Sequence, residues 1–202
     1  INGYSDKTFK PDRELTRYDI TLIIGRYLVQ LGYNLPKDAK IDIRFNDLTR
    51  NTEEALLNYA ALLYDVGILQ GDQYKNLNPY DKLTREQLAL ILTRAFTIID
   101  DFDYVAHVAK QTFVREYSDV LALREQSQVA IDVLDFYDIV IDQKFFPQDY
   151  ATRGQFATMT YKMMQLKERQ QQAENLTIVD WSVISPKRVK FTMSDGSTED
   201  VL

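Results

Sequence analysis

The sequence contains no cysteine and a single histidine, His107. The absence of cysteine excludes disulfides, thiolate metal sites and thiol nucleophiles. One histidine leaves no cluster for zinc and argues against a histidine-dependent hydrolase. We therefore expect no metal site, no cofactor and no enzymatic activity. We interpret His107 as a partly buried helical residue rather than a ligand.

Glycine and proline are also scarce, with 7 and 5 residues among 202. This argues against a sandwich or barrel built from many tight turns. No apolar run approaches the ~20 residues that span a bilayer. The formal net charge of −6 disfavours binding to nucleic acid or anionic membranes through overall charge. The sequence therefore predicts a globular protein with neither nucleic acid nor membrane as a partner.

The sequence does contain a threefold internal repeat. Three strings that begin with Thr-Arg start 68 residues apart (84 − 16 and 152 − 84), at Thr16, Thr84 and Thr152. The same shift superposes three prolines, which are Pro11, Pro79 and Pro147. An aromatic or apolar residue lies two positions before each proline. Equal spacing and matched residue types together make chance a poor explanation.

Each repeat has the pattern of a helix, a polar loop and a second helix. Apolar spacing of i, i+3, i+4 and i+7 predicts leading helices over 54–66 and about 127–137, and a second helix begins at each Thr-Arg string. The first repeat starts at its loop, so we expect the chain to be cut on its N-terminal side. Without that leading helix, we expect Ile20, Ile24 and Leu28 to be partly uncovered unless another chain or an upstream segment covers them. The repeats predict a mainly α fold whose copies share one core.

The Thr-Arg strings carry a capping signal and an electrostatic mismatch. Each threonine is followed three residues later by a residue that completes a capping box, namely Asp19, Gln87 or Gln155. The arginines Arg17, Arg85 and Arg153 sit at the first helical position, where the helix dipole favours acidic residues. Two explanations stay open. Each arginine pairs with a nearby carboxylate, such as Asp81 or Asp149, or the arginine and free helix amides together receive an anionic ligand.

These residues resemble a known family. The strings Asn2-Gly3-Tyr4-Ser5-Asp6-Lys7-Thr8-Phe9-Lys10-Pro11 and Leu15-Thr16-Arg17 resemble the S-layer homology motif, written GYxDGTFxP and ITRAE. Phe45-x-Asp47-Leu48 and Tyr117-x-Asp119-Val120 are similar to its FxDV opening. The resemblance covers about residues 1–167 as three copies. The third copy departs most, because its loop is three residues shorter and lacks glycine.

The resemblance implies a pseudo-threefold trimer of motifs around a central helical bundle. It implies non-covalent anchoring of a secreted surface-layer protein to the Gram-positive cell wall. The implied ligand is a secondary cell wall polysaccharide, often with a pyruvate ketal on N-acetylmannosamine, held in grooves between motifs. Because the ketal is a carboxylate, it would answer the mismatch of the arginines, and we expect Arg85 to clamp it. Other S-layer subunits would be contacted through the region after the anchor.

The family pattern also suggests which residues bind the carbohydrate. The three helix-start arginines are Arg17, Arg85 and Arg153. The loop residues carried over from the motif are Gly3, Tyr4, Asp6, Lys7, Gly71 and Lys75. Asp47 and Asp119 would either hydrogen-bond sugar hydroxyls or cap the helix that follows.

The residues after about 167 have a different pattern. A Gln- and charge-rich stretch over 167–175 extends the last helix into a linker, and alternating runs over 177–183 and 188–193 predict strands with a turn at 194–197. We therefore expect motif 1 at 1–44, motif 2 at 45–112, motif 3 at 113–167, a linker at 168–175 and the start of an immunoglobulin-like β-domain at 176–202. Such few strands are not stable alone, so we expect the chain to continue past Leu202.

A second function class remains open at this point. The repeats would also suit a helical protein-interaction or self-assembly module whose arginines pair only with its own carboxylates. The two functions differ in whether the chain binds a glycan.

Overall fold

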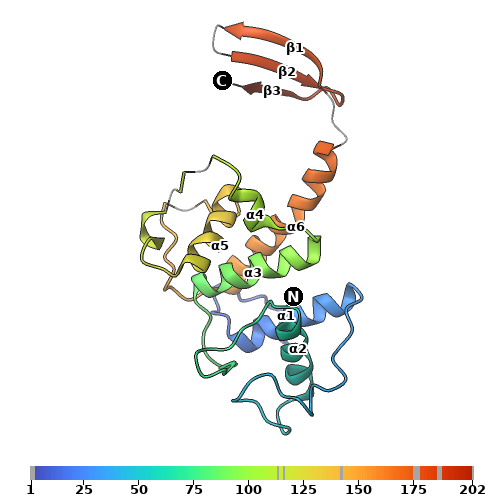
Figure 1. Cartoon of the computed structure of the whole chain (residues 1–202), viewed down its shortest axis with the longest axis vertical. Coiled ribbons are helices and arrows are strands. Elements are labelled where there is room, and N and C mark those ends of the chain that lie inside the picture. The colour runs from blue at the N-terminus through green and yellow to red at the C-terminus, as the bar shows by residue number, and fades with distance from the viewer. Residues whose placement is uncertain are drawn as a thin grey trace. The chain divides into compact units, whose positions relative to one another are not determined.

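A computed structural model describes residues 3–112, 114–115, 117–141, 143–174, 178–185 and 188–201. The chain forms two compact units, Ile1–Tyr161 and Lys162–Leu202. The described part is mainly helical (Figure 1), as the sequence predicts. Its helices are α1 (Arg17–Gln30), α2 (Glu54–Asp65), α3 (Arg85–Asp100), α4 (Tyr104–Val108), the 3₁₀ turn η1 (Ser118–Val120), α5 (Glu125–Phe136) and α6 (Arg153–Glu174).

The predicted helix starts are confirmed by their caps. Thr16 accepts a hydrogen bond from the amide of Asp19, whose carboxylate accepts one from the Thr16 amide in return. Thr84 with Gln87 and Thr152 with Gln155 form the same reciprocal pair at α3 and α6. Each cap stabilises its helix by about 1 kcal/mol.

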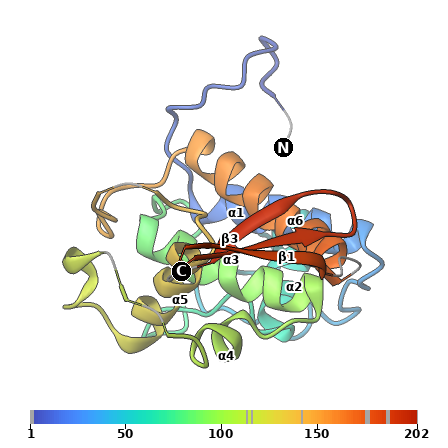
Figure 2. The ribbon, with the colours of Figure 1, turned by 90° about the horizontal axis from the view of Figure 1, so that it is seen from above.

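A cycle of backbone hydrogen bonds joins the three repeats just before these caps. The Leu15 amide donates to the Ala151 carbonyl over 2.9 Å, the Leu83 amide to Leu15 over 2.8 Å, and the Ala151 amide to Leu83 over 2.8 Å. All three side chains are fully buried. In Figure 2 the N-terminal segment approaches the start of α6, where Gly154 donates to the carbonyl of Pro11. Segments far apart in sequence thus meet at one point.

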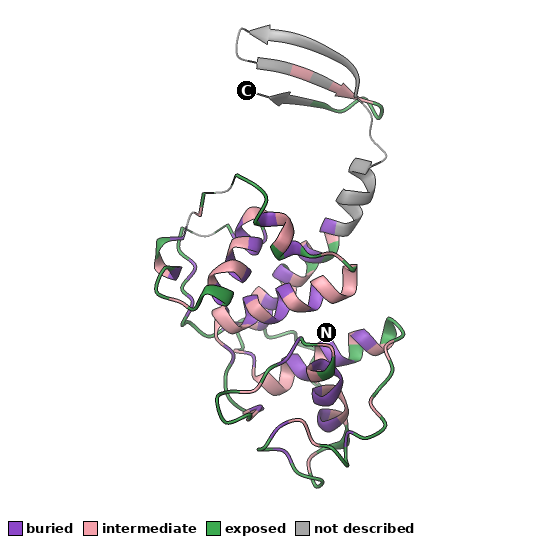
Figure 3. Ribbon diagram, viewed as in Figure 1, coloured by how far each residue is buried: buried purple, intermediate pink, exposed green. Residues whose placement is uncertain are grey.

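The core lies between the paired helices. In Figure 3 buried residues run along α1, α2, α3 and α5, where α1 packs on α2 and α3 packs on α5. Ile20, Ile24 and Leu28 have exposed fractions of only 0–5%, so the prediction that they are partly uncovered is wrong. The reason is that α2 covers α1. At their contact a Cβ on Gly25 would lie 2.4 Å from Cβ of Tyr59, so only glycine fits there.

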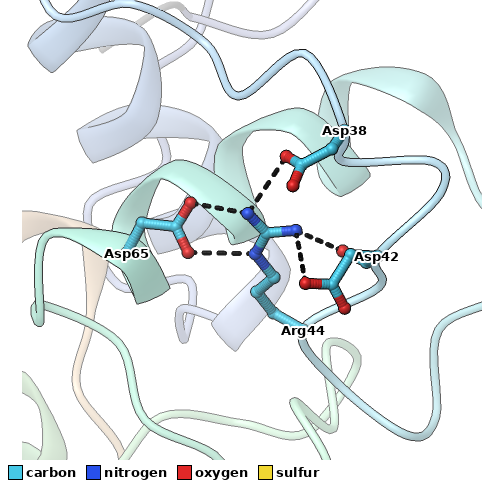
Figure 4. A network of polar contacts seen from close by, with 4 residues as sticks. All are labelled: Asp38, Asp42, Arg44 and Asp65. Atoms are coloured by element: carbon cyan, nitrogen blue, oxygen red, sulfur yellow. Dashed lines mark hydrogen bonds and ion pairs between the residues drawn. The ribbon is translucent and has the colours of Figure 1, made fainter.

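An ion network holds the long connection between α1 and α2, residues 31–53 (Figure 4). Arg44 makes two hydrogen bonds to Asp65, of 2.9 Å and 2.8 Å, in the fork geometry that suits a guanidinium. Nη2, which makes the 2.8 Å bond, also contacts Asp38 at 3.1 Å, and Nη1 lies 3.4 Å from the carboxylate of Asp42. The hydrogen bonds to Asp65 raise the pKa of Arg44 most, burial opposes the shift, and Asp38 raises it further. The network ties the loop to the end of α2.

The short helix α4 contains His107, which the sequence analysis interpreted as helical without predicting bounds for its helix. It packs on α5 and α3, and its five residues are too few for a periodic pattern to be recognised. His107, on α4, contacts the rings of Phe102, Phe136 and Tyr137 with centroids 5.4–6.1 Å apart. The interpretation of His107 as a partly buried helical residue is confirmed.

The second unit contains the predicted strands. Strands β1 (Ile178–Ser185), β2 (Arg188–Met193) and β3 (Thr198–Val201) form an antiparallel sheet in the order β1-β2-β3. In this register residue 191 of β2 pairs with residue 181 of β1 and with residue 199 of β3. The β2–β3 turn has Gly196 at φ 83°, a conformation that glycine adopts without strain. An immunoglobulin-like domain stays a prediction, as do the motif boundaries.

Two features are absent from the residues that the structure describes. None of the helices there is both long and apolar enough to cross a membrane. Within the same residues, no group of three or more histidine, aspartate or glutamate side chains is arranged to hold a metal ion.

Candidate functional site

The three helix-start arginines make the same contact in each repeat. Nε donates to a carbonyl two residues before the loop proline, and the pairs are Arg17 to Leu77 at 2.5 Å, Arg85 to Phe145 at 2.7 Å and Arg153 to Phe9 at 2.9 Å. Each arginine thereby ties its helix to the loop of another repeat. The three Nε atoms therefore donate to backbone carbonyl oxygens rather than to the carboxylates of Asp81 and Asp149.

The amides at the helix starts are already occupied. In α1 the amides of Arg17 and Tyr18 donate to the carbonyls of Asp81 and Pro79, and that of Asp19 donates to its cap. In α3 the corresponding amides donate to Asp149, Pro147 and the cap, and in α6 to Arg13, Pro11 and the cap. The hypothesis that free helix amides receive an anion is therefore wrong. The reason is that neighbouring loops satisfy these donors.

Asp47 and Asp119 also serve the loops. The carboxylate of Asp47 accepts from the amides of Leu77 and Asn78, both at 2.7 Å. Asp119 accepts from the amides of Phe145 and Phe146, at 3.2 Å and 2.7 Å. The expected alternative of a helix cap is wrong for both residues. Each instead fixes the loop segment whose carbonyl receives an arginine.

Arg17 lines a groove of about 720 Å³, which we call the first groove. Its walls are the loop over residues 68–82, one face of α3 and the start of α5. Besides its bond to Leu77, Arg17 donates from Nη2 to the Gln70 carbonyl at 3.1 Å. Its Nη1 has no hydrogen-bond partner among the described residues. Burial lowers the pKa of Arg17, and the charges of Asp47, Asp81 and Asp72 oppose that shift.

A second groove of about 570 Å³ lies at Arg85. Five of its six lining residues lie 68 positions after residues that line the first groove. The five residues of the second groove are Arg85, Lys144, Phe146, Asp149 and Gln155. Their counterparts in the first groove are, in the same order, Arg17, Asn76, Asn78, Asp81 and Gln87. The second groove therefore repeats the first with different side chains. Arg85 lies with the short third loop and does not line the groove of the fuller second loop. Arg17 is the helix-start arginine that lines the groove of the second loop.

The first-loop residues gather around Arg153 instead. The Arg153 guanidinium lies over the rings of Tyr4 and Phe9, at 4.9 Å and 5.0 Å from their centroids. Arg13 hydrogen-bonds the Tyr4 hydroxyl. A Cβ on Gly3 would lie 3.1 Å from the Thr8 carbonyl, which is a tight contact.

Asp6 and Lys7 shape the same loop. Asp6 accepts hydrogen bonds from the amide and hydroxyl of Thr8, and it pairs with Lys10 at 3.0 Å. Lys7 has φ 61°, and its amide donates to the Tyr4 carbonyl. Both side chains are exposed. The contacts of Asp6 account for the turn in this loop.

In the second loop Gly71 and Lys75 approach each other closely. A Cβ on Gly71 would lie 2.8 Å from the backbone of Lys75, so this turn requires glycine. Lys75 has φ 62°, as Lys7 does in the first loop, and its ammonium lies 5.6 Å from the Tyr64 ring centroid. Gly71 lines the first groove with Arg17. The structure thus brings Arg17 and Gly71, two of the expected site residues, together in the first groove.

Sequence reasoning missed several residues of the first groove. Its further charged side chains are Asp72, Asp81, Lys82, Glu86, Arg94 and Arg124. For Arg94 a signal was present, because the 68-residue shift superposes it on Arg26 and Lys162. A basic residue thus recurs at one helical position in all three repeats. For Arg124 the sequence carries no such signal.

Comparison with protein families gives a match for the N-terminal residues. Residues 1–19 match the S-layer homology domain. This match, which includes the loop with Gly3 and the Thr16-Arg17 helix start, confirms the resemblance for the first of the three copies. It supports a role in cell-surface anchoring and a secreted, cell-surface localisation.

Three similar proteins are large enzymes of which this chain spans only a small part. An amylopullulanase of Thermoanaerobacterium thermosulfurigenes is 26% identical over 168 residues, which are 82% of this chain and 8% of the relative. Exoglucanase XynX of Acetivibrio thermocellus is 23% identical, over 82% of this chain and 14% of the relative. An endoglucanase of a Bacillus species is 28% identical, over 78% and 15%.

Proposed function

We propose that this chain anchors a surface-layer protein to the Gram-positive cell wall by binding an acidic secondary cell wall polysaccharide between its S-layer homology motifs. In this proposal the three motifs form a pseudo-threefold trimer, and the acidic groups are pyruvate ketals. The chain binds without catalysing a reaction. The region after the anchor contacts other S-layer subunits.

The observation that carries the proposal is the position of Arg17 in the first groove. Two of its nitrogens are fixed by the carbonyls of Leu77 and Gln70, and the partnerless Nη1 is left for an acceptor on a ligand. Arginine held in this way is pre-organised for a carboxylate. The exposed carboxylate of Asp81 lines the same groove and suits sugar hydroxyls. Arg17 therefore replaces Arg85 as the proposed clamp.

A groove of about 720 Å³ lies within the range of ~300–1,000 Å³ that is typical of ligand sites. Its lining is polar, which suits a sugar better than an apolar ligand. Because the protein has a net charge of −6, an acidic polymer would be repelled at long range. Binding would therefore depend on fixed local cations such as Arg17.

The test is titration calorimetry of the full chain with polysaccharide released from purified cell walls, in its native form and with its pyruvate removed. Arg17→Gln should lower affinity about 10- to 100-fold, because a charge-assisted hydrogen bond contributes about 1.5–3 kcal/mol. Arg17→Lys should restore only part of it. Arg26→Gln, at an exposed residue of α1, is the control for a lost surface charge.

Several results would refute the proposal. Equal binding of native and pyruvate-free polymer by the wild type would remove the carboxylate clamp. Binding to bare peptidoglycan at the same strength would remove the polymer as the ligand. No binding to any wall fraction would favour a protein-interaction module instead.

A further inference from the structure

The first groove extends well beyond Arg17. Residues of α3 that line it run from Glu86 to Arg94 along one helix face, a span of roughly 12 Å at 1.5 Å per residue. Arg17 lies at the loop that leads into α3, since its amide bonds to Asp81 and its side chain to Leu77. Arg94 lies two turns further along the helix. The groove therefore has two cationic ends.

Arg94 is a half-buried cation without a carboxylate partner among the described residues. Its one hydrogen bond runs from Nη2 to the side-chain oxygen of Gln126 at 3.1 Å. Burial alone lowers the pKa of Arg94, with no opposite charge to offset the shift. A desolvated cation of this kind costs stability, and such groups concentrate at functional sites. The contacts of Arg94 within the described residues do not explain why a charged side chain occurs at this position.

The surroundings explain why Arg94 is desolvated. A smaller hollow of about 370 Å³ adjoins the groove and shares Leu90, Arg94 and Gln126 with it. Its other walls include the apolar side chains of Val105 and Val129. Arg94 thus lines both the groove and a hollow whose walls are mostly apolar but include Glu125. A ligand group that accepts a hydrogen bond from Arg94 would therefore compete with little water for the guanidinium.

A second cationic side chain, that of Arg124, lies at the same end of the groove as Arg94. Arg124, at the start of α5, lines the groove with Arg94 and is exposed. Among the described residues, its side chain has neither a hydrogen bond nor an ion pair. Gln126, which receives Arg94, follows two residues later on α5. By contrast, Lys82 in this groove is paired with Glu14 at 2.6 Å.

We propose that Arg94 and Arg124 form a second anion-binding subsite at the α5 end of the first groove. The ligand is then an oligosaccharide segment of more than one sugar unit that carries two acidic groups. One group binds Arg17, and the other binds Arg94 and Arg124. This inference rests on the proposed function, and it adds the length and charge spacing of the segment that the groove takes.

The experiment uses the full chain and fragments of the wall polysaccharide made by partial hydrolysis, sorted by length. Affinity is measured by calorimetry for wild type, Arg17→Gln, Arg94→Gln and Arg124→Gln. Arg26→Gln is the matched control, because Arg26 is the repeat counterpart of Arg94 on α1 and does not line the groove. Melting temperatures are recorded for all variants, and Arg94→Lys tests whether the fork geometry matters.

For fragments that carry two acidic groups, Arg94→Gln should lower affinity about 10-fold or more, and Arg124→Gln should lower it by a smaller factor because Arg124 is exposed. Fragments with one acidic group should depend on Arg17 but not on Arg94. The melting temperature of Arg94→Gln should equal or exceed that of the wild type, because the substitution removes a desolvated charge. Arg26→Gln should change neither quantity.

Three outcomes would overturn the inference. If Arg94→Gln binds long fragments like the wild type while Arg17→Gln does not, the second subsite fails and the proposed function stands. If Arg94→Gln lowers the melting temperature but leaves affinity per folded molecule unchanged, Arg94 is only structural. If the wild type binds no fragment of any length, the proposed function fails and this inference fails with it.

Discussion

Removing the carboxylate of Asp47 tests whether it supports the loop or contacts the sugar. Asp47→Ala deletes both acceptors of the Leu77 and Asn78 amides. Leu77 is fully buried, so its amide would lose its partner away from water, at a cost of about 1–3 kcal/mol. Asn78 is only partly buried, and water can replace much of its bond. At 2–4 °C per kcal/mol for a chain of this size, the melting temperature should fall by about 2–12 °C.

The assay is thermal unfolding followed by circular dichroism, with polymer affinity measured on the folded fraction. Asp119→Ala is the matched variant, because it removes the same pair of bonds in the third loop. Both variants should lose stability, while only Asp47→Ala should weaken binding, because the Leu77 carbonyl holds Arg17. An unchanged melting temperature together with lost affinity would refute the reasoning, since Asp47 would then act on the ligand itself.

Three further predictions concern backbone, packing and charge. Phe146 has φ 53°, a backbone conformation that is costly for a bulky residue, and its repeat counterpart Asn78 adopts the same conformation. Phe146→Asn should therefore stabilise the fold by about 0.5–1 kcal/mol in denaturant titrations. A loss of stability would contradict the idea that Phe146 is strained. In the same titrations, Gly25→Ala should destabilise by about 1–3 kcal/mol because its Cβ would meet Cβ of Tyr59, although alanine favours helix by ~1 kcal/mol. In a Tyr59→Gly background, which removes that Cβ, the sign should reverse. Hydrogen bonds from the Asn76 amide and the Asn78 side chain lower the pKa of Asp72 below 3.8, so its contribution is present above about pH 4 and is lost as pH falls through the lowered pKa. Melting temperatures between pH 5 and 2.5 should therefore fall less steeply for Asp72→Asn, and parallel curves would show that these bonds do not matter.

The local features of the fold were readable from the sequence because they depend on short-range chemistry. The capping boxes need only a threonine and a partner three residues later, and the structure has all three. The periodic apolar residues of α1, α2, α3 and α5 placed these helices to within a few residues of their bounds. The alternation of apolar and polar residues placed β1 and β2 to within a few residues of their bounds in the same way. The 68-residue spacing of the Thr-Arg strings was likewise visible in the sequence alone.

The partners of those residues were decided only by tertiary structure. The mismatch of an arginine at a helix start identified Arg17, Arg85 and Arg153 as unusual, but their acceptors are carbonyls about 60 residues or more away. A carbonyl is present at every residue, so no sequence signal marks which one is used. For the same reason the occupied helix amides and the loop-holding role of Asp47 could not be foreseen.

Which arginine shares a groove with the second loop also depended on the way the repeats are arranged. The sequence determined that three equivalent loops and three equivalent arginines exist, because identical spacing gives each copy the same local structure. It did not determine that Arg17 faces the second loop and Arg85 the third, because each repeat places its arginine against the loop of another. Burial of Arg94 was decided in the same way, by α5 packing on α3. Local sequence therefore specified the parts of the site, and the contacts between repeats specified which parts act together.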